Sequence, residues 1–390
     1  MGDNTVKAKP ISSKEFFMPG LYIHIPFCLQ KCPYCDFASF DDISYMADDY
    51  IGAVIKELKD AAKNAKKGFD TLFIGGGTPT ALNEKNLDAL FSGIYSTFPR
   101  KNFREITIEA NPETITAKKA KLLAANVTRV SMGCQSFSDS ELKSLGRIHD
   151  SNAIGRGFEI LRGEKIENIN LDIIYGLEGQ GVESALYSVN EAVKSGPEHI
   201  SFYMMTLYED TPFGERAQKG FLKLPGDEII ESIYMEGCAA LEKAGYSQYE
   251  ISNFSKAGRE CIHNLNYWNQ GEYLGAGSSA ASYLNGKRRV NTASPEEYIK
   301  KIKRGESAVE TSEETTPDLY LKEYIMLRLR TVMGMDTREF KRVFNFDFNA
   351  KYSNIIENLV EAGLARAGND NFHLTRKGFL LSNEIIGKFF

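Results

Sequence analysis

The sequence lacks a long apolar run. No stretch of about 18 consecutive apolar residues occurs, so we expect no membrane-spanning helix. The opening segment, MGDNTVKAKPISSKEFF, has no apolar core of the kind found in signal peptides. Val6 stands where a myristoylation motif needs Ser or Thr. We therefore expect a cytoplasmic protein, with at most transient contact at a membrane surface.

A concentrated basic surface is also missing from the sequence. The chain of 390 residues carries 47 Lys and Arg against 52 Asp and Glu, and both signs are mixed along its length. Proteins that track a phosphate backbone present a basic patch or stripe, so we expect no nucleic acid partner. The short cluster GKRR at 286–289 is typical of a solvated loop and does not change this.

Cysteine is scarce, and its placement is uneven. Of the six cysteines, Cys134, Cys238 and Cys261 are isolated. Without a secretory signal, a disulfide framework is not expected. Cys134 lies in a predicted strand and Cys238 in a predicted helix, which are ordinary places for a buried free thiol. The remaining three are concentrated in one short segment, IPFCLQKCPYCDF, at 25–37.

Strand and helix patterns alternate through the first two hundred residues. Short β-rich runs occur at 21–25, 71–75, 105–110, 129–135, 168–176 and 199–207. Between them, stretches such as 48–65, 84–98, 116–126 and 153–163 space their apolar residues three and four apart, as an amphipathic helix does. Six strand-helix repeats predict an α/β fold with a parallel sheet, here a partial (β/α)6 TIM-like barrel.

The pattern changes after residue 207. We expect a helix at 226–244, a strand at 246–254 and a loop rich in His, Asn, Tyr and Gly as far as residue 292. Helical segments follow from 315, and FHLT near the end resembles the β-piece of a winged helix. The predicted organisation is a lead at 1–19, the barrel at 20–225, a barrel extension at 226–300 and a C-terminal α-rich winged-helix-like domain at 301–390.

Polar and glycine-rich residues follow the predicted strands where each one ends. The cysteine segment follows the first strand, GGGTPT the second, and Glu109 closes the third. Gln135 ends the fourth strand, and Asp172 lies within the fifth. Reactive residues of such barrels gather at the carboxyl ends of the strands, so we expect these side chains to share one site.

The cysteine segment contains three thiols where a metal site made only of cysteine usually has four. A zinc site would need a fourth ligand, and the candidate for it is His24, which alternates with Ile23 and Ile25. Cys28, Cys32 and Cys35 fit better as ligands of a four-iron cluster with one iron left open. An open coordination position is typical of a reactive metal site.

The spacing CxxxCxxC, with Tyr34 before the last cysteine, resembles the motif of the radical S-adenosylmethionine (SAM) superfamily. The sequence around this motif, YIHIPFC…CPYCDF, is similar to that of the HemN/HemW branch of the superfamily. This branch contains oxygen-independent coproporphyrinogen III oxidase and a heme-chaperone relative. GGGTPT, EANPE and IIYGL follow in the same order, and the resemblance runs from about residue 20 to the C-terminus. It implies a [4Fe-4S] cluster, SAM and one-electron chemistry that yields a 5′-deoxyadenosyl radical.

The resemblance also implies which residues hold SAM. A carboxylate such as Glu109 or Asp172 alone would more often be a helix cap or an ion-pair partner, and GGGT alone could be a plain turn. The motif match instead implies a SAM-contacting set: Tyr22, Tyr34, Gly76, Gly77, Thr78, Glu109, Gln135, Arg147, Asp172, Ile174 and Met204.

Two features separate the oxidase from the chaperone. The oxidase has a further cysteine two places after Cys35, where this chain has Phe37, and it has a longer N-terminal extension. HNxxYW, with His263, Asn264, Tyr267 and Trp268, resembles the heme-binding signature of the chaperones. On its own the segment could be a turn with a core Trp. We take His263 first as iron ligand, then Tyr267 or Cys261.

The function implied is a heme chaperone that binds heme, a [4Fe-4S] cluster and SAM. It would deliver the heme to an acceptor hemoprotein, for example a membrane respiratory one. The alternative is oxygen-independent coproporphyrinogen III oxidase, an enzyme of porphyrin biosynthesis. A third option is another radical enzyme that acts on a tetrapyrrole, such as one that opens the heme ring. Enzyme activity is left open, with no decarboxylation of coproporphyrinogen III expected.

Overall fold

The computed structural model describes residues 19–63 and 68–390. The expected N-terminal lead therefore lies outside the described residues, apart from Pro19, as do residues 64 and 65 at the end of the first predicted helix. Six parallel strands form the barrel wall: β1 (Gly20–Ile25), β2 (Thr71–Gly76), β3 (Glu105–Ala110), β4 (Arg129–Gln135), β5 (Ile169–Tyr175) and β6 (His199–Met204).

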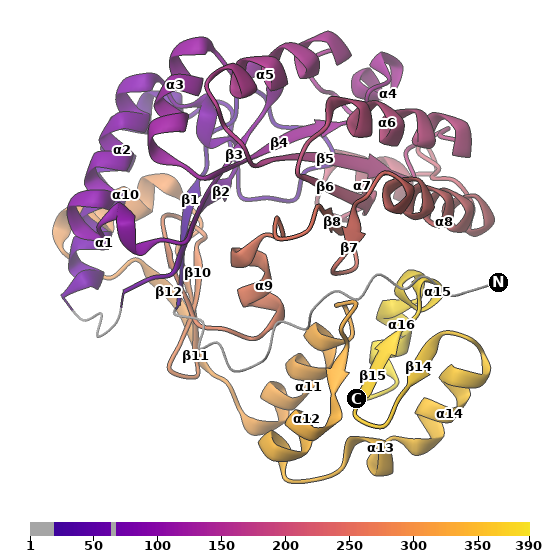
Figure 1. The fold of residues 1–390 in the computed structure, drawn as a ribbon. Coiled ribbons are helices and arrows are strands. Elements are labelled where there is room, and N and C mark those ends of the chain that lie inside the picture. Colours follow the sequence, from indigo (N-terminus) through magenta and orange to yellow (C-terminus); the bar gives the residue numbers. More distant parts are fainter. Residues whose placement is uncertain (1–18, 64–67) are drawn as a thin grey trace.

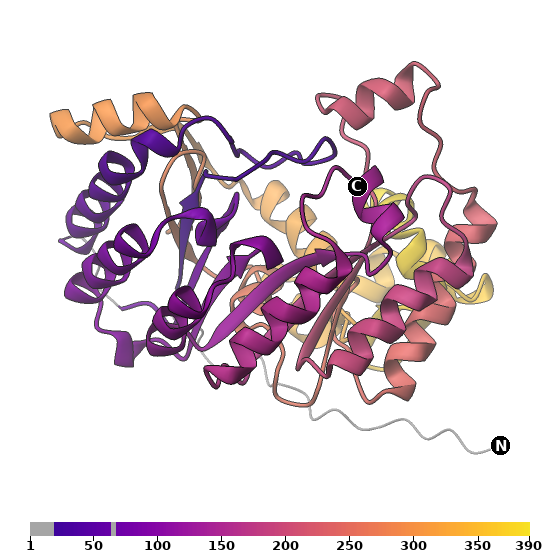
Figure 2. The same cartoon turned by 90° about the horizontal axis from the view of Figure 1, so that it is seen from above.

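Helices cover the outer face of these strands in an arc (Figures 1 and 2). They are α1 (Ala47–Ala62), α2 (Glu84–Thr97), α3 (Ala117–Asn126), α4 (Asp139–Ser144), α5 (Ser151–Gly163), α6 (Val182–Ser195) and α8 (Asp227–Lys243). The short helix α7 (Pro212–Gln218) instead packs near the loop after β1, where Phe213 N–H donates to the Pro33 carbonyl at 3.0 Å. Short 3₁₀ turns punctuate the connections: η1 (Ser44–Met46), η2 (Pro79–Ala81), η3 (Arg100–Asn102) and η4 (Pro112–Thr114). The predicted partial (β/α)6 barrel is confirmed.

Alternation along each strand separates the apolar core from a polar lumen. In β1, Leu21, Ile23 and Ile25 are fully buried against the helical layer, whereas Tyr22 and His24 lie on the opposite face. The same period of two, which follows from the pleat of a strand, places polar side chains of the neighbouring strands in the lumen. The core of the protein therefore lies between strands and helices, and the lumen is free for a site.

The segment after the barrel contains more regular structure than the sequence predicted. Its elements are β7 (Ser247–Gln248), β8 (Asn253–Ser255), α9 (Ile262–Trp268), β9 (Tyr273–Ala276), β10 (Ala281–Leu284), β11 (Lys287–Asn291), α10 (Pro295–Arg304) and β12 (Val309–Glu314). The single strand expected at 246–254 is wrong, because the Tyr249 N–H donates to the Asn253 carbonyl at 3.1 Å and folds the segment back on itself.

The loop expected up to residue 292 is also wrong. Strand β9 pairs in parallel with β1, and β10, β11 and β12 extend the sheet from it in antiparallel fashion. The resulting order is β12-β11-β10-β9-β1-β2-β3-β4-β5-β6-β8-β7. β9 pairs with β1, an edge strand about 250 residues earlier in the sequence, and this pairing supplies the hydrogen bonds that make these short segments strands. β12 lies beyond residue 300, where the C-terminal domain was expected to begin, yet it belongs to the large sheet.

The C-terminal part lies on the open side of the barrel (Figure 1). It consists of α11 (Pro317–Arg328), β13 (Met335–Asp336), α12 (Thr337–Phe344), α13 (Phe348–Lys351), α14 (Ser353–Glu361), β14 (Ala365–Ala367), β15 (Asn371–Leu374), α15 (Arg376–Leu380) and α16 (Ser382–Gly387). Its strands form a separate sheet in the order β13-β15-β14. Helices joined to a small antiparallel sheet agree with the winged-helix-like expectation.

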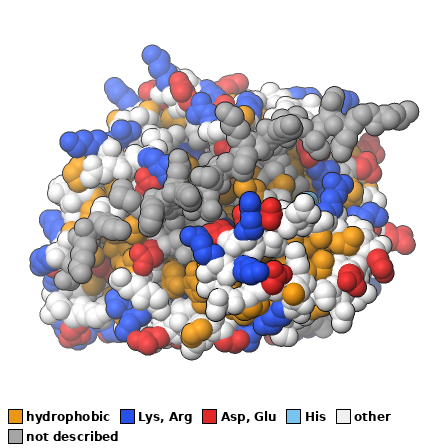
Figure 3. Space-filling view, turned by 60° about the horizontal axis from the view of Figure 1, so that its bottom comes forward, with side chains coloured by type: hydrophobic (Ala, Val, Ile, Leu, Met, Phe, Trp, Pro, Cys, Tyr) orange, Lys and Arg blue, Asp and Glu red, His pale blue; other side chains and the backbone are white. Residues whose placement is uncertain are grey.

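Charge is distributed without large single-sign areas on the face seen in Figure 3, where basic and acidic side chains are intermixed. Within the part of the chain that the structure describes, no helix is both long and apolar enough to cross a bilayer.

Candidate functional site

The three clustered cysteines lie on one loop directly after β1. Backbone bonds fasten the loop at both ends, from Cys28 N–H to the Phe40 carbonyl at 2.9 Å and from Phe40 N–H to the Pro26 carbonyl at 2.8 Å. His24 Nε2 lies 2.7 Å from the Ala38 carbonyl oxygen. His24 therefore orders this loop from β1. Cys28, Cys32 and Cys35 are partly exposed and line a common cavity of about 130 Å³.

The glycine segment after β2 packs directly beneath the cysteine loop. Gly77 N–H donates to the Ile25 carbonyl at 2.8 Å, and Thr78 N–H donates to the Phe27 carbonyl at 2.7 Å. A Cβ on Gly77 would lie 2.8 Å from the Phe27 oxygen and 3.1 Å from Cys28 Sγ. Close backbone approach is the reason for glycine here, and it brings Gly76, Gly77 and Thr78 into the cavity wall.

Two partly buried carboxyl groups line the same cavity. Glu109 Oε2 accepts a hydrogen bond from Gly76 N–H at 3.0 Å, and Asp172 Oδ1 accepts one from Asn170 Nδ2 at 2.6 Å. Burial, with a smaller contribution from Asp172, raises the pKa of Glu109 to about 7, and burial also raises the pKa of Asp172. Both carboxyl groups would ionise more readily beside a positively charged ligand.

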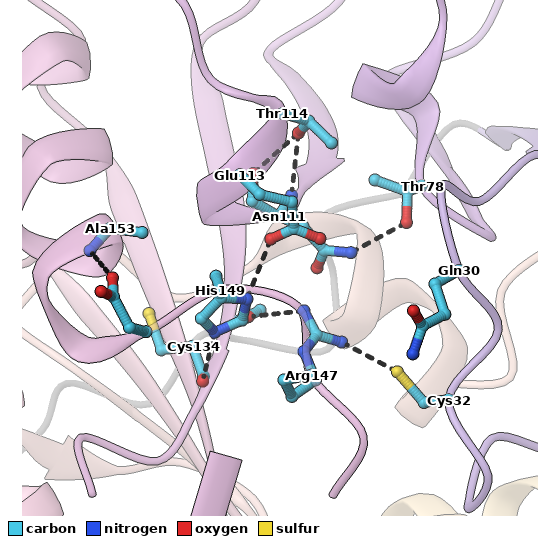
Figure 4. Close-up of polar contacts among 12 residues, drawn as sticks. Gln30, Cys32, Thr78, Asn111, Glu113, Thr114, Cys134, Arg147, His149 and Ala153 are labelled. Atoms are coloured by element: carbon cyan, nitrogen blue, oxygen red, sulfur yellow. Dashed lines mark hydrogen bonds and ion pairs between the residues drawn. The ribbon is translucent and has the colours of Figure 1, made fainter. Parts of the chain in front are cut away.

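Arg147 connects the cysteine loop to β4 (Figure 4). Its Nη1 donates to Cys32 Sγ at 3.4 Å and its Nη2 donates to the Gly133 carbonyl at 3.1 Å. Nearby, His149 Nδ1 lies 2.9 Å from Glu113 Oε2, and His149 Nε2 lies 3.2 Å from the Cys134 carbonyl. The pKa of Glu113 is lowered by His149 and Arg147 in spite of its burial. The Arg147 guanidinium thus lies next to the Cys32 thiol.

Most of the expected SAM-contacting set is brought together by the fold. The cavity is lined by Tyr34, Gly76, Gly77, Thr78, Glu109, Gln135, Arg147 and Asp172 in addition to the cysteines. Three expected members lie elsewhere. Tyr22 faces a second cavity, Ile174 is buried in a small apolar cluster with Leu145 and Met205, and Met204 is about half exposed.

Other residues of this cavity were not among the expected SAM contacts. Asn111, Ser131, Gly133 and Tyr203 line it, and the Tyr203 hydroxyl donates to Gln135 Oε1 at 2.8 Å. Asn111, Ser131 and Gly133 lie two or four residues along the chain from an expected site residue, whereas Tyr203 lies next to Met204, on the opposite face of β6. The alternation of a pleated strand was therefore a usable signal, because it places residues i and i+2 on the same face.

The lining of this cavity restricts the kind of metal group that it could hold. No three His, Cys, Asp or Glu side chains within residues 19–63 and 68–390 converge in the way that a single ion requires. One zinc ion would draw its thiolates to about 2.3 Å from one centre, whereas an iron–sulfur cluster holds them apart across its own width. Three thiols around one cavity match in number the three cysteine ligands of a four-iron cluster with one iron left open.

The HNxxYW segment lies at the other end of the barrel. It forms α9, whose first turn is capped by a carboxylate of β3: Glu105 accepts from the backbone N–H groups of Ile262 and His263, each at 3.0 Å. His263 also approaches Gly20 and Thr71, which begin β1 and β2. Because the cysteine loop follows the carboxyl end of β1, the two expected sites are separated by the length of the lumen.

His263 is not accessible to iron in this structure. Its side chain is fully buried, with Nδ1 at 2.7 Å from Thr71 Oγ1 and Nε2 at 2.8 Å from the Tyr267 hydroxyl. Burial lowers its pKa to about 3, so the ring is neutral. Cys261 is equally buried, and its thiol donates to Glu105. Of the expected heme residues, Asn264, Tyr267 and Trp268 keep partial exposure.

Comparison with known proteins agrees with this geometry. The family model of the Radical SAM superfamily matches residues 22–192, and that of the HemN C-terminal domain matches residues 315–381. The solved structure of coproporphyrinogen III oxidase (HemN) from Escherichia coli superposes with a TM-score of 0.82 at 24% identity, covering 97% of this chain and 91% of that one. The fold and the cysteine loop define the class: a radical SAM protein.

Curated relatives specify the family within that class. The chain is 36% identical to the heme chaperone HemW of Bacillus subtilis, over 95% of this chain and 99% of that one. It is 35% identical to HemW of Haemophilus influenzae, over 95% of this chain and 97% of that one. It is 40% identical to HemW of Escherichia coli, over 70% of each chain. The chain belongs to the HemW family.

Proposed function

We propose that this protein is a heme chaperone that carries a [4Fe-4S] cluster and SAM, and that it passes heme to an acceptor hemoprotein. The observation that carries the proposal is the shared cavity of Cys28, Cys32 and Cys35 in a chain with HemW relatives along nearly its full length. Phe37, which is exposed at the rim of this cavity, supports the chaperone over the oxidase, because the oxidase motif has cysteine there.

The chain's own residues have distinct tasks in this proposal. The three cysteines would hold the cluster, which when bound supplies one-electron chemistry at SAM. Arg147 balances negative charge at Cys32. Glu109 and Asp172 would receive the cationic part of SAM, and Gly76 and Gly77 let the ligand approach the backbone.

Anaerobic reconstitution tests the cluster part of the proposal. Iron and sulfide bound per chain should fall to background when any one of the three clustered cysteines is replaced by alanine. Cys238→Ala is the matched control, because this buried thiol lies in α8 and should leave the cluster content unchanged. Equal iron in all variants would contradict the assignment.

Incubation of the reconstituted protein with coproporphyrinogen III, SAM and a reductant separates the chaperone from the oxidase. We expect no decarboxylated product, whereas protoporphyrinogen would refute the chaperone function. A second assay mixes the heme-loaded protein with an apo-hemoprotein and follows the absorption of the acceptor. Heme should move to the acceptor; retention of all heme by this chain would contradict delivery.

A further inference from the structure

The turn that follows β3, Asn111-Pro112-Glu113, is rigidly built (Figure 4). Pro112 occupies the first position of η4, where its ring fixes φ at a helical value. Thr114 N–H donates to the Asn111 carbonyl at 2.9 Å, and Asn111 N–H donates to Thr114 Oγ1 at 3.3 Å. Thr114 Oγ1 also lies 2.6 Å from Thr80 Oγ1, which ties the turn to η2. The side chains of Asn111 and Glu113 therefore extend from a fixed base.

One side chain of this turn supports a hydrogen-bond donor to the first clustered cysteine. Asn111 Nδ2 donates to Thr78 Oγ1 at 3.0 Å, and the Thr78 hydroxyl donates to Cys28 Sγ at 3.7 Å. The Asn111 amide occupies a lone pair of the hydroxyl oxygen, so the hydroxyl hydrogen is left for the sulfur. Thr78 is buried, which limits competition by water for this hydrogen. Asn111 therefore orients the Thr78 hydroxyl toward Cys28.

The other side chain of the turn supports a donor to the second clustered cysteine. Glu113 Oε2 lies 2.9 Å from His149 Nδ1, and His149 Nε2 lies 3.2 Å from the Cys134 carbonyl oxygen. Both partner atoms are acceptors, so an imidazolium with N–H on both nitrogens satisfies them together. This bridge fixes the segment that carries Arg147, whose Nη1 donates to Cys32 Sγ at 3.4 Å.

An irregularity at the end of β4 lies where these groups attach. The register between β4 and β5 shifts between Gly133 and Gln135, and the φ of Gln135 is +69°. Such a value is uncommon for a residue with a side chain, and strained backbone of this kind is concentrated at functional sites. The Gly133 carbonyl accepts from Arg147 Nη2 at 3.1 Å, and the next carbonyl, of Cys134, is the partner of His149. The strained end of β4 thus holds both side chains.

We propose that the Asn111-Pro112-Glu113 turn positions Thr78 and Arg147 as hydrogen-bond donors to two cluster cysteines, and that these donors raise the reduction potential of the cluster. The inference rests on the proposed function, because it requires a [4Fe-4S] cluster on Cys28 and Cys32. Hydrogen bonds and positive charge at the cysteine sulfurs stabilise the reduced, more negative cluster over the oxidised one. One electron then passes from an external reductant to the cluster more readily, with no bond made or broken.

Redox titration of the anaerobically reconstituted full chain with dithionite, in the absence of SAM, tests this role. The reduced cluster is followed by its electron paramagnetic resonance signal. At a fixed solution potential, Thr78→Val and Arg147→Gln should each lower the ratio of reduced to oxidised cluster about tenfold, because each loses one hydrogen bond to a charged sulfur. For one electron this change is about 59 mV. Arg156→Gln is the matched control, since this exposed arginine of α5 pairs with Asp150 at 3.8 Å, and its potential should equal that of the wild type.

Substitutions in the turn separate positioning from charge. Asn111→Leu should lower the potential, and it should cause no further fall in a chain that already contains Thr78→Val. Glu113→Leu removes a negative charge, which by itself would raise the potential. A fall in this variant instead reports that Arg147 has lost its support, and the fall should disappear in an Arg147→Gln background.

The outcomes separate this inference from the proposed function. Wild-type chain that binds no iron and sulfide would refute both. Unchanged potentials in Thr78→Val and Arg147→Gln would overturn the inference and leave the cluster assignment standing. A rise in Glu113→Leu, or no change in Asn111→Leu, would overturn the role of the turn. Loss of bound iron in either Thr78→Val or Arg147→Gln would assign that donor to retention of the cluster, and would also overturn the inference.

Discussion

Gly76 lies between two side chains of the candidate SAM site, His24 of β1 and Glu109 of β3. Its φ is +112°, a value that side chains rarely adopt, and a Cβ there would lie 2.5 Å from the His24 ring. Its N–H donates to Glu109. The residue therefore sets the position of His24, which orders the cysteine loop, and of a carboxylate in the cavity wall.

Replacement of Gly76 by alanine should destabilise the protein by about 2–4 kcal/mol, since backbone strain and steric overlap add. Urea unfolding of the cluster-free chain measures the change. Gly163→Ala is the matched control, because Gly163 ends α5 with nothing within 4 Å of an added Cβ. That variant should be unchanged or up to about 1 kcal/mol more stable. Equal stability of the two variants would contradict the steric argument.

At the scale of single elements, α9 depends on a residue far away in sequence. Its N-cap residue, Cys261, makes no side-chain capping bond, and the helix has only seven residues. Isolated helices of this length are unstable in water. Glu105 replaces the missing cap from the first position of β3, and it is only 4% exposed. The helix exists because the barrel supplies its acceptor atoms.

Glu105→Gln should lower the free energy of unfolding by about 1–3 kcal/mol, because an amide has one acceptor oxygen where two N–H groups require two. Thermal unfolding followed by circular dichroism measures this loss. Glu159→Gln, on the exposed face of α5, should stay within about 0.5 kcal/mol of the wild type. A Glu105→Gln protein as stable as this control would show that the cap is dispensable.

On the scale of the whole molecule, the barrel and the C-terminal part are joined through the turn between β7 and β8. Ile251 N–H donates to the Arg330 carbonyl at 2.9 Å, and Val332 N–H donates to the Tyr249 carbonyl at 3.1 Å. Glu250 lies at the centre of this junction with 1% of its surface exposed, and burial raises its pKa to about 7. The junction therefore contains a titratable group in the physiological range.

The raised pKa of Glu250 gives a pH dependence of defined sign. The folded chain holds this proton more tightly than the unfolded chain, whose Glu pKa is near 4.5. Its stabilising contribution is complete below about pH 4.5 and is lost as pH rises through about 7. Between pH 5 and pH 8 the free energy of unfolding of the wild type should fall by up to about 3 kcal/mol more than that of Glu250→Gln. Urea unfolding at the two pH values measures this difference.

Glu109 titrates in the same range, since its pKa is also about 7. The Glu109→Gln variant therefore serves as a reference, and the two effects should add because the groups lie in different parts of the fold. Identical pH profiles for wild type and Glu250→Gln would contradict the assignment of this proton to the junction.

The local sequence determined the barrel and most of the cysteine site. The six strands follow from alternating and apolar runs, and the site residues at their ends follow from the rule that the carboxyl ends of parallel strands share one edge. Cys28, Cys32, Cys35, Glu109 and Asp172 were identifiable because their chemistry is encoded within a few neighbouring residues. Ser131 and Gly133 were within reach of the alternation along β4, because they share a face with Gln135.

Only the tertiary structure decided the features that depend on distant partners. β9 became a strand because β1 offered an unpaired edge, and α9 became a helix because Glu105 supplied its cap. His263 looked like a ligand in the sequence, yet Thr71 and Tyr267 occupy both its nitrogens. Hydrogen-bond partners and burial are set by chain segments that meet only after folding. The sequence by itself therefore specified the chemistry of the cysteine loop, whereas the fold specified which aromatic and polar groups remain free to bind a ligand.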